Sequence, residues 1–167
     1  MLIQARKIRD INFPKLMHVY SESNMENGQN EWPDLPAGFA QKMAEQSFYQ
    51  YLKEVFFPTD GAFYAVWEED GRYVSALRME PYRDGLLLEG LETAPEARKQ
   101  GYALKLILEV LSLLAEKGSV TVYSHVHKKN LPSQKLHEKC GFQVISDHAA
   151  YIDGSVNYCA CTYVFKA

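Results

Sequence analysis

A glycine-containing turn at residues 98–103, Arg-Lys-Gln-Gly-Tyr-Ala, constrains this chain more than any other feature. It lies between an apolar, strand-like segment, Leu86 to Thr93, and an apolar run with helical spacing, Leu104 to Leu114. A helix that begins at such a turn presents backbone N–H groups with no partner inside the helix. The helix dipole adds roughly half a positive charge there. The segment therefore predicts a strand–turn–helix unit whose turn binds phosphate, and a ligand with a pyrophosphate is expected.

The rest of the chain divides into segments with strand-like and helix-like patterns. Strands are expected at Leu2 to Ile8, Ala62 to Glu68, Tyr73 to Met79, Leu86 to Thr93, Ser119 to His127, Phe142 to Ile152 and Tyr158 to Phe165. Helices are expected at Phe13 to Ser23, Phe39 to Phe57, Gly101 to Lys117 and Leu131 to Lys139. Prolines and glycines predict a long loop over Asn24 to Gly38. This order predicts an α/β fold with a mixed, largely antiparallel sheet of six or seven strands and about four helices.

Length and composition exclude several classes of protein. The 167 residues fit one domain, spanning residues 1–167, with a sizeable core. The net charge of -3 gives no broad basic surface, so nucleic acid is not expected as a partner. No apolar run approaches the roughly 18–20 residues of a membrane span, and Met1 to Lys7 lacks the apolar core of a secretion signal. We therefore expect a cytoplasmic protein that does not bind membranes.

The cysteines and histidines do not form a metal-ligand pattern. Cys140 is isolated, and Cys159 and Cys161 are two residues apart, so they share a face of the expected strand and are predicted to be small core residues. His125 and His127 also share a face, but no further ligands accompany them. No metal site is expected.

A second motif follows the glycine turn, and the two together resemble the GNAT superfamily of acyl-CoA-dependent N-acyltransferases. Members carry a Gln/Arg-x-x-Gly-x-Gly/Ala turn, matched here by Arg98, Gly101 and Ala103. They also carry an Asn-x-x-Ser/Ala helix that ends in Gly-Phe, matched by Asn130, Ser133, Gly141 and Phe142. The resemblance is strong over about a third of the chain, from Leu86 to Phe142, and the order of elements extends it loosely over the whole length.

The resemblance implies that acetyl-CoA, the acyl donor, lies between two splayed parallel strands, Leu86 to Thr93 and Ser119 to His127. Backbone amides of the glycine turn would hold its pyrophosphate, and a backbone N–H near Leu91 to Thr93 would stabilise the oxyanion. Asn130 would contact the pantetheine arm, cap the second helix, or do both. The residues expected at the cofactor are Leu91, Glu92, Thr93, Arg98, Lys99, Gln100, Gly101, Tyr102, Ala103, Asn130 and Ser133.

The expected catalytic acid departs from the family pattern. Many members have a tyrosine that protonates the departing CoA thiolate, and this chain has His137 in that position. An unperturbed histidine has a pKa of about 6.5, so only about a quarter is protonated at pH 7. His137 can therefore act as the acid only with a raised pKa or through its protonated fraction. The alternative is a partly buried helix histidine.

The attacking amine must lose a proton, and Glu89 and Glu92 are the candidate bases. Strand alternation predicts that these two carboxylates point to opposite faces, so that at most one lines the site. The alternative for each is a solvated strand charge. A covalent acyl-cysteine is not favoured, because Cys140 ends a helix, where the dipole raises a thiol pKa. Direct transfer in a ternary complex is expected.

These observations predict an N-acetyltransferase that moves an acetyl group from acetyl-CoA to a primary amine of a small molecule or a peptide. Acidic and aromatic residues in the first two expected helices and the loop between them suit a cationic amine. Two other classes stay open: a non-catalytic acyl-CoA-binding or regulatory module, and an interaction protein with an exposed sheet edge. The identity of the acceptor, the acyl chain and the oligomeric state, including a homodimer, also stay open.

Overall fold

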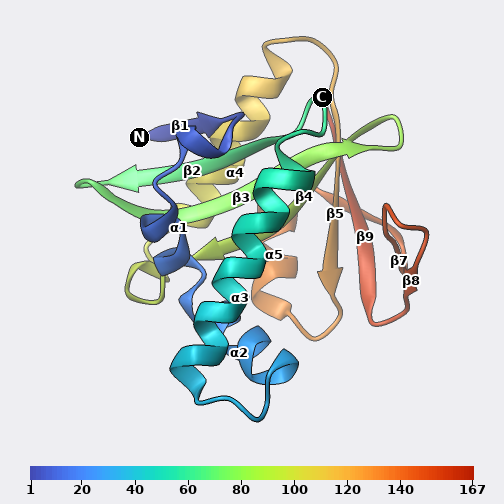
Figure 1. Cartoon of the computed structure of the whole chain (residues 1–167). Helices are drawn as coiled ribbons and strands as arrows, with labels where there is room; N and C mark the ends of the chain where they lie inside the picture. Colours follow the sequence, from blue (N-terminus) through green and yellow to red (C-terminus); the bar gives the residue numbers. More distant parts are fainter.

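The computed structural model describes all residues 1–167 and is built on a seven-stranded sheet (Figure 1). The strands lie in the order β1-β2-β3-β4-β5-β9-β6, and every neighbouring pair is antiparallel except β4 and β5. The strands are β1 (Leu2–Ala5), β2 (Phe63–Glu69), β3 (Arg72–Tyr82), β4 (Gly85–Thr93), β5 (Thr121–His127), β6 (Gln143–Ser146), β7 (Ala149–Ala150), β8 (Val156–Asn157) and β9 (Ala160–Lys166). The expected mixed, largely antiparallel α/β fold is confirmed.

Helices lie over both faces of the sheet, with α1 to α3 on one face and α4 and α5 on the other (Figure 1). Their bounds are α1 (Phe13–Val19), α2 (Ser21–Glu31), α3 (Ala37–Tyr51), α4 (Tyr102–Ala115) and α5 (Leu131–Lys139). A short π-helical turn, Leu52–Phe56, continues α3. None of the helices combines the length and the hydrophobicity that a membrane span requires.

Each face of the sheet has its own hydrophobic core. Helix α4 packs with its apolar side, including Leu106, Ile107 and Val110, against Leu77 and Leu88 of the sheet. Burial of side chains of this size stabilises the fold by about 1.5–3 kcal/mol each. The other core joins α1 and the end of α3 to residues of β2 and β3 that point to the opposite face. These two layers hold β4 and β5 in the middle of the molecule, where the candidate site lies.

The prediction of a long loop over Asn24 to Gly38 is wrong, because most of this segment forms α2. Gly28 does not break this helix. It lies against α3 so closely that a Cβ atom there would be 2.5 Å from the backbone of Ala40. The glycine therefore allows two helices to pack tightly, and the connection is confined to a short segment around Pro33 and Pro36.

The two strands expected at Phe142 to Ile152 and Tyr158 to Phe165 are present in shorter form as β6 and β9, which pair with each other. The segment between them folds back as the separate hairpin β7–β8. The prediction that both late cysteines lie in the core is wrong, since Cys159 is exposed and Cys161 is half-buried. Cys159 precedes the first residue of β9, so the inward–outward alternation of the strand has not begun at that position.

Candidate active site

The start of α4 is an open, backbone-lined anion site. Gly101 is the N-cap residue, with φ of 84°, and no side chain caps the helix. A Cβ atom on Gly101 would meet no atom within 4 Å, so the space beside it is free. The first N–H groups of the helix therefore face a site that suits phosphate oxygens.

A groove of about 410 Å³ runs from this helix start to α5. Its lining includes three lysines, Lys99 from the turn and Lys135 and Lys139 from α5. Because these ammonium groups flank the free amides of α4, the groove carries positive charge where an anionic ligand would lie. Of the turn residues expected at the cofactor, the groove is lined by Arg98, Lys99, Gly101, Tyr102 and Ala103, together with Thr93 from the end of β4.

Two polar side chains of the turn are directed to protein partners. The guanidinium of Arg98 forms an ion pair with Glu22 of α2 at 2.6 Å, and its Nε donates to the carbonyl of Thr93 at 3.2 Å. Gln100 donates through its side-chain amide to the carbonyl of Glu96 at 3.0 Å. The side chain of Arg98 thus connects the turn to α2 and to the end of β4.

Strands β4 and β5 separate beyond their third paired residue. Their parallel pairing runs only from Leu86 to Leu88, opposite Val122 to Ser124. A cavity of about 310 Å³ opens where they part, and the divergence of the two strands can be followed in Figure 1. This cavity is lined by Leu87, Leu88, Glu89, Gly90, Leu91, Ser124, His125, Val126, His127, Asn130, Ser133, His137 and Tyr151. The expected splay between these strands is therefore present, with Leu91, Asn130 and Ser133 along it.

Asn130 caps α5, which was one of the two roles expected for it. Its side-chain oxygen accepts a hydrogen bond from the backbone N–H of Ser133 at 3.1 Å. This bond fixes the start of α5 beside the cavity, because it satisfies one of the free donors of the helix.

His137 is buried between α5 and β5, and its pKa is lowered, so the acid role through a raised pKa is contradicted and the protonated fraction is smaller than in a free histidine. Its Nδ1 lies 2.8 Å from the carbonyl of Ser133, and its Nε2 lies 2.9 Å from the hydroxyl of Ser124. In the neutral ring, Nδ1–H donates to the carbonyl and Nε2 accepts from the hydroxyl. Burial lowers the pKa of His137, and the bond to the Ser133 carbonyl offsets this only in part. The geometry is that of a satisfied core histidine.

A bulge in β4 corrects the expected orientation of the two candidate bases. Glu89 pairs with Arg78 of β3 and Glu92 pairs with Ala76, so Gly90 and Leu91 together oppose one residue. Because the bulge adds one residue, Glu92 returns to the face of the sheet on which Glu89 lies. The φ angle of 59° at Gly90 accommodates the extra residue. The prediction that Glu89 and Glu92 point oppositely is therefore wrong, because both lie on the face covered by α1 to α3.

Glu92 lines a cavity of about 350 Å³ between this face and the helices α2 and α3. Burial raises the pKa of Glu92, while a hydrogen bond from Ser23 and the charge of Arg98 oppose the shift. The cavity is lined by Tyr20, Ser23, Asn24, Asn27, Glu31, Ala44, Ser47, Phe48, Tyr51, Arg78, Gly90 and Glu92. Carboxylates, amides and aromatic faces in one cavity suit a cationic, hydrogen-bonding ligand.

Arg78 is a site residue that the sequence did not reveal. Its guanidinium lies over the rings of Phe48, Tyr51 and Phe56, at 5.5, 5.3 and 5.9 Å from their centroids. It also forms an ion pair with Glu89 at 3.2 Å. A single arginine in a strand forms no recognisable sequence motif, because the residues that it contacts come from α3, the π-helical turn and β4. Arg78 fixes Glu89 beside the bulge.

Glu80 lies next to this ion pair, and both line a neighbouring cavity of about 590 Å³. Burial, a hydrogen bond with Glu89 and repulsion from its charge raise the pKa of Glu80 from 4.5 to about 8. The raised pKa favours the protonated form of Glu80, and the charge of Arg78 opposes the shift only in part.

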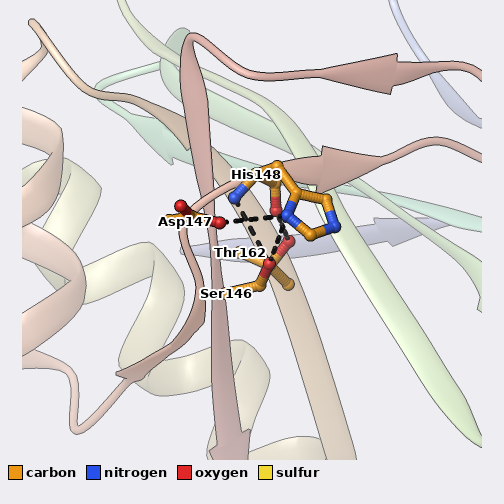
Figure 2. Close-up of polar contacts among 4 residues, drawn as sticks. All are labelled: Ser146, Asp147, His148 and Thr162. Atoms are coloured by element: carbon orange, nitrogen blue, oxygen red, sulfur yellow. Dashed lines mark hydrogen bonds and ion pairs between the residues drawn. The ribbon is translucent and has the colours of Figure 1, made fainter.

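Two nucleophile arrangements can be set aside. Ser146, Asp147 and His148 have the composition of a hydrolase triad, but Figure 2 shows both partners on one ring nitrogen. The Ser146 hydroxyl and the Asp147 carboxylate each lie 3.1 Å from Nδ1 of His148, so the aspartate does not orient the ring toward the serine through the other nitrogen. Cys140 is buried, and burial raises its pKa to about 11, in the expected direction. Neither group is an activated nucleophile.

Comparisons with known proteins agree with this geometry. A model of the acetyltransferase (GNAT) family matches residues 18–142. Aminoglycoside N(6')-acetyltransferase type 1 of Serratia marcescens is 39% identical over 85 residues, which are 50% of this chain and 56% of that protein. The match therefore spans about half the length of this curated relative.

Solved structures share the fold at low identity. The PaiA N-acetyltransferase from Thermoplasma acidophilum, in complex with coenzyme A, has a TM-score of 0.65 and 14% identity, covering 100% of this chain and 99% of that one. The ribosomal-protein-S18-alanine N-acetyltransferase from Escherichia coli has a TM-score of 0.62 and 17% identity, covering 99% and 94%.

Proposed function

Because this chain belongs to the GNAT family of acetyltransferases, we propose that it transfers an acetyl group from acetyl-CoA to a primary amine by direct attack in a ternary complex. One observation carries the proposal: the bulge of β4 lies between the cleft where β4 and β5 part and the cavity under α2 and α3. Gly90 lines both of these spaces. A thioester in the first space and an amine in the second would meet at this residue.

The donor side is proposed to hold the pyrophosphate at the start of α4. The free amides of the helix, with Lys99, Lys135 and Lys139 around them, favour a doubly charged ligand. The pantetheine arm would then follow the cleft between β4 and β5, past Asn130 and Ser133. The match to the glycine turn and the coenzyme A complex of the Thermoplasma relative support this route.

Glu92 is proposed as the general base. In the reaction, the amine nitrogen forms a bond to the thioester carbon, the C–S bond breaks, and the CoA thiolate leaves with the electron pair. The proton of the amine goes to Glu92, directly or through water. Burial raises the pKa of this carboxylate, which brings it closer to the pH at which a general base is most effective.

The thiolate needs no strong acid, because a thiol pKa near 8.5 already makes it a fair leaving group. His137 is proposed to hold α5 on β5 through Ser124 rather than to donate this proton, since both of its ring nitrogens are occupied and its pKa is lowered.

The acceptor is proposed to be a cationic amine. Glu31 and Glu92 supply negative charge in the cavity, and Tyr20 and Phe48 supply aromatic faces. The Serratia relative is named for an aminoglycoside, a class of acceptor that carries several amines and hydroxyls, and the asparagines and serines of the cavity suit such groups.

Purified protein mixed with acetyl-CoA and a panel of amines, with release of free thiol as the readout, tests the function. The panel holds an aminoglycoside, a linear polyamine, an amino acid and a peptide. Thiol release that depends on one of these amines supports the proposal. Tight binding of acetyl-CoA in calorimetry without turnover on any amine would favour a non-catalytic acyl-CoA-binding module. Absence of binding would overturn the transferase assignment.

A further inference from the structure

Two buried tyrosine hydroxyls form a chain that ends at the bulge of β4. Tyr64 of β2 donates to the hydroxyl of Tyr20 at 2.8 Å, and Tyr20 donates to the carbonyl of Gly90 at 2.5 Å. Burial raises the pKa of both tyrosines well above its usual value, so both hydroxyls stay protonated and able to donate. In such a chain each bond polarises the next, which strengthens the final bond to Gly90.

The bond to Gly90 fixes the direction of the peptide that follows. The chain has no cis peptide bond, and in a trans peptide the carbonyl and the next N–H point in opposite directions. The carbonyl of Gly90 points to Tyr20, on the face covered by α1 to α3. The N–H of Leu91 therefore points away from Tyr20. Both Gly90 and Leu91 line the cleft between β4 and β5.

Arg78 lies close to Gly90. A Cβ atom at position 90 would lie 3.1 Å from Nε of Arg78, so the glycine backbone and the guanidinium are close. Arg78 is itself held by three aromatic rings and by Glu89. The carbonyl of Gly90 is therefore held by a hydrogen bond, and a fixed side chain lies beside the glycine.

Resting on the proposed function, we infer that Tyr20 is a positioning residue: its hydroxyl holds the Gly90 carbonyl so that the N–H of Leu91 is aimed at the thioester oxygen of acetyl-CoA. When the amine attacks, the electron pair of the carbonyl moves onto that oxygen, and the N–H stabilises the charge until the C–S bond breaks. Tyr20 acts through the backbone and exchanges no proton with the substrates. Donors placed in advance are most effective in this role, because they need no reorganisation during the reaction.

The substitution Tyr20→Phe isolates the hydroxyl. The ring of Tyr20 packs edge-on against Phe48 and Tyr64, with centroids 5.8 and 6.4 Å apart, and these contacts do not need the oxygen. Tyr73→Phe is the matched control. Tyr73 is also buried in the core under α1, and its hydroxyl accepts one hydrogen bond, from the N–H of Asn12 at 3.2 Å, away from the bulge.

The experiment measures kcat, KM and the infrared carbonyl band of bound acetyl-CoA labelled with carbon-13 at the thioester carbon. In the natural protein the band should move to lower frequency than in free acetyl-CoA, because a hydrogen bond weakens the carbonyl bond. In Tyr20→Phe most of that shift should be lost and kcat should fall about 10- to 100-fold, with KM for acetyl-CoA within about twofold. Tyr73→Phe should keep the shift and a kcat within about twofold.

Equal kinetics in Tyr20→Phe and Tyr73→Phe would overturn the inference, as would an unshifted carbonyl band in the natural protein. If Tyr20→Phe does not fold, the infrared measurement on the natural protein can still overturn the inference. A natural protein that binds acetyl-CoA and acetylates an amine, but shows no band shift, would remove the role of Tyr20 and leave the proposed function intact. A natural protein that does not bind acetyl-CoA would remove both.

Discussion

The start of α4 and the bulge of β4 make opposite kinds of site. The α4 site is built from the backbone of one continuous segment, is open to solvent, and has empty space beside Gly101. The bulge is surrounded by side chains from α3, β2, β3 and the junction of α1 and α2, and these are buried or half-buried. A backbone site of the first kind is encoded locally, whereas the second exists only when distant segments have packed. The two should therefore respond differently to substitution.

The largest effect is expected for Gly101→Glu, which places a carboxylate in the space for the pyrophosphate. Affinity for coenzyme A should fall by about 100-fold or more, because like charges meet at the helix start. Titration calorimetry measures this. Gly101→Ala is the control for the backbone, since φ of 84° strains any side chain there without adding charge. Unchanged affinity in Gly101→Glu would place the pyrophosphate elsewhere.

On the acceptor side, Glu92→Gln should lower kcat about 100-fold and leave the affinity for acetyl-CoA unchanged, because it removes the proton acceptor alone. Glu89→Gln is the comparison, since Glu89 lies on the same face but is paired with Arg78. Steady-state kinetics should give the greater loss in Glu92→Gln. A greater loss in Glu89→Gln would transfer the base role to that residue.

Gly90→Ala tests how tightly the bulge is packed. The free energy of unfolding should fall by about 1–3 kcal/mol, because a side chain at φ of 59° is strained and its Cβ would lie 3.1 Å from Arg78. Gly71→Ala is matched in backbone, with φ of 73°, but has no atom within 4 Å of the Cβ position. Urea unfolding should show a smaller loss there. Equal losses would mean that Arg78 does not crowd the bulge.

The last expected effect is a change in stability with pH at Glu80, which solvent reduces because this side chain is only half-buried. Its pKa of about 8 in the folded protein exceeds its ordinary value of 4.5, so the folded state binds more protons than the unfolded state between these values. The group therefore destabilises the fold progressively as pH rises through that window. Glu80→Gln removes this loss, and its stability relative to the natural protein should increase from pH 5 to pH 8 in urea unfolding. If the free energy of unfolding changed with pH in the same way in both proteins, the raised pKa of Glu80 would be contradicted.

The sequence was sufficient for most of the fold and for the donor side of the candidate site. Period-two and helical patterns located the seven strands of the sheet and four of the α-helices, and the glycine turn located the start of α4. Asn130 was readable as a cap, because a cap depends on residues within one helical turn.

The acceptor side of the candidate site could not be predicted from the sequence, because it depends on contacts between distant segments. A bulge depends on the register of two paired strands, so nothing in the segment around Glu89 and Glu92 revealed that both carboxylates share a face. Arg78 needed partners from three other elements, and the low pKa of His137 depended on its burial. Helix α2 was missed because Gly28 and the following prolines match a loop in composition, while the close contact with α3 appears only in three dimensions.

The close contact at Gly28 limits the width of the acceptor cavity. Asn27 and Glu31 of α2 face Ser47 and Phe48 of α3 across the cavity, and the glycine sits where the two helices touch. Any larger residue there would wedge the helices apart and widen the space between their walls. The size of the molecule that fits in the cavity therefore depends on Gly28, which lies outside the cavity lining, because this residue has no Cβ atom.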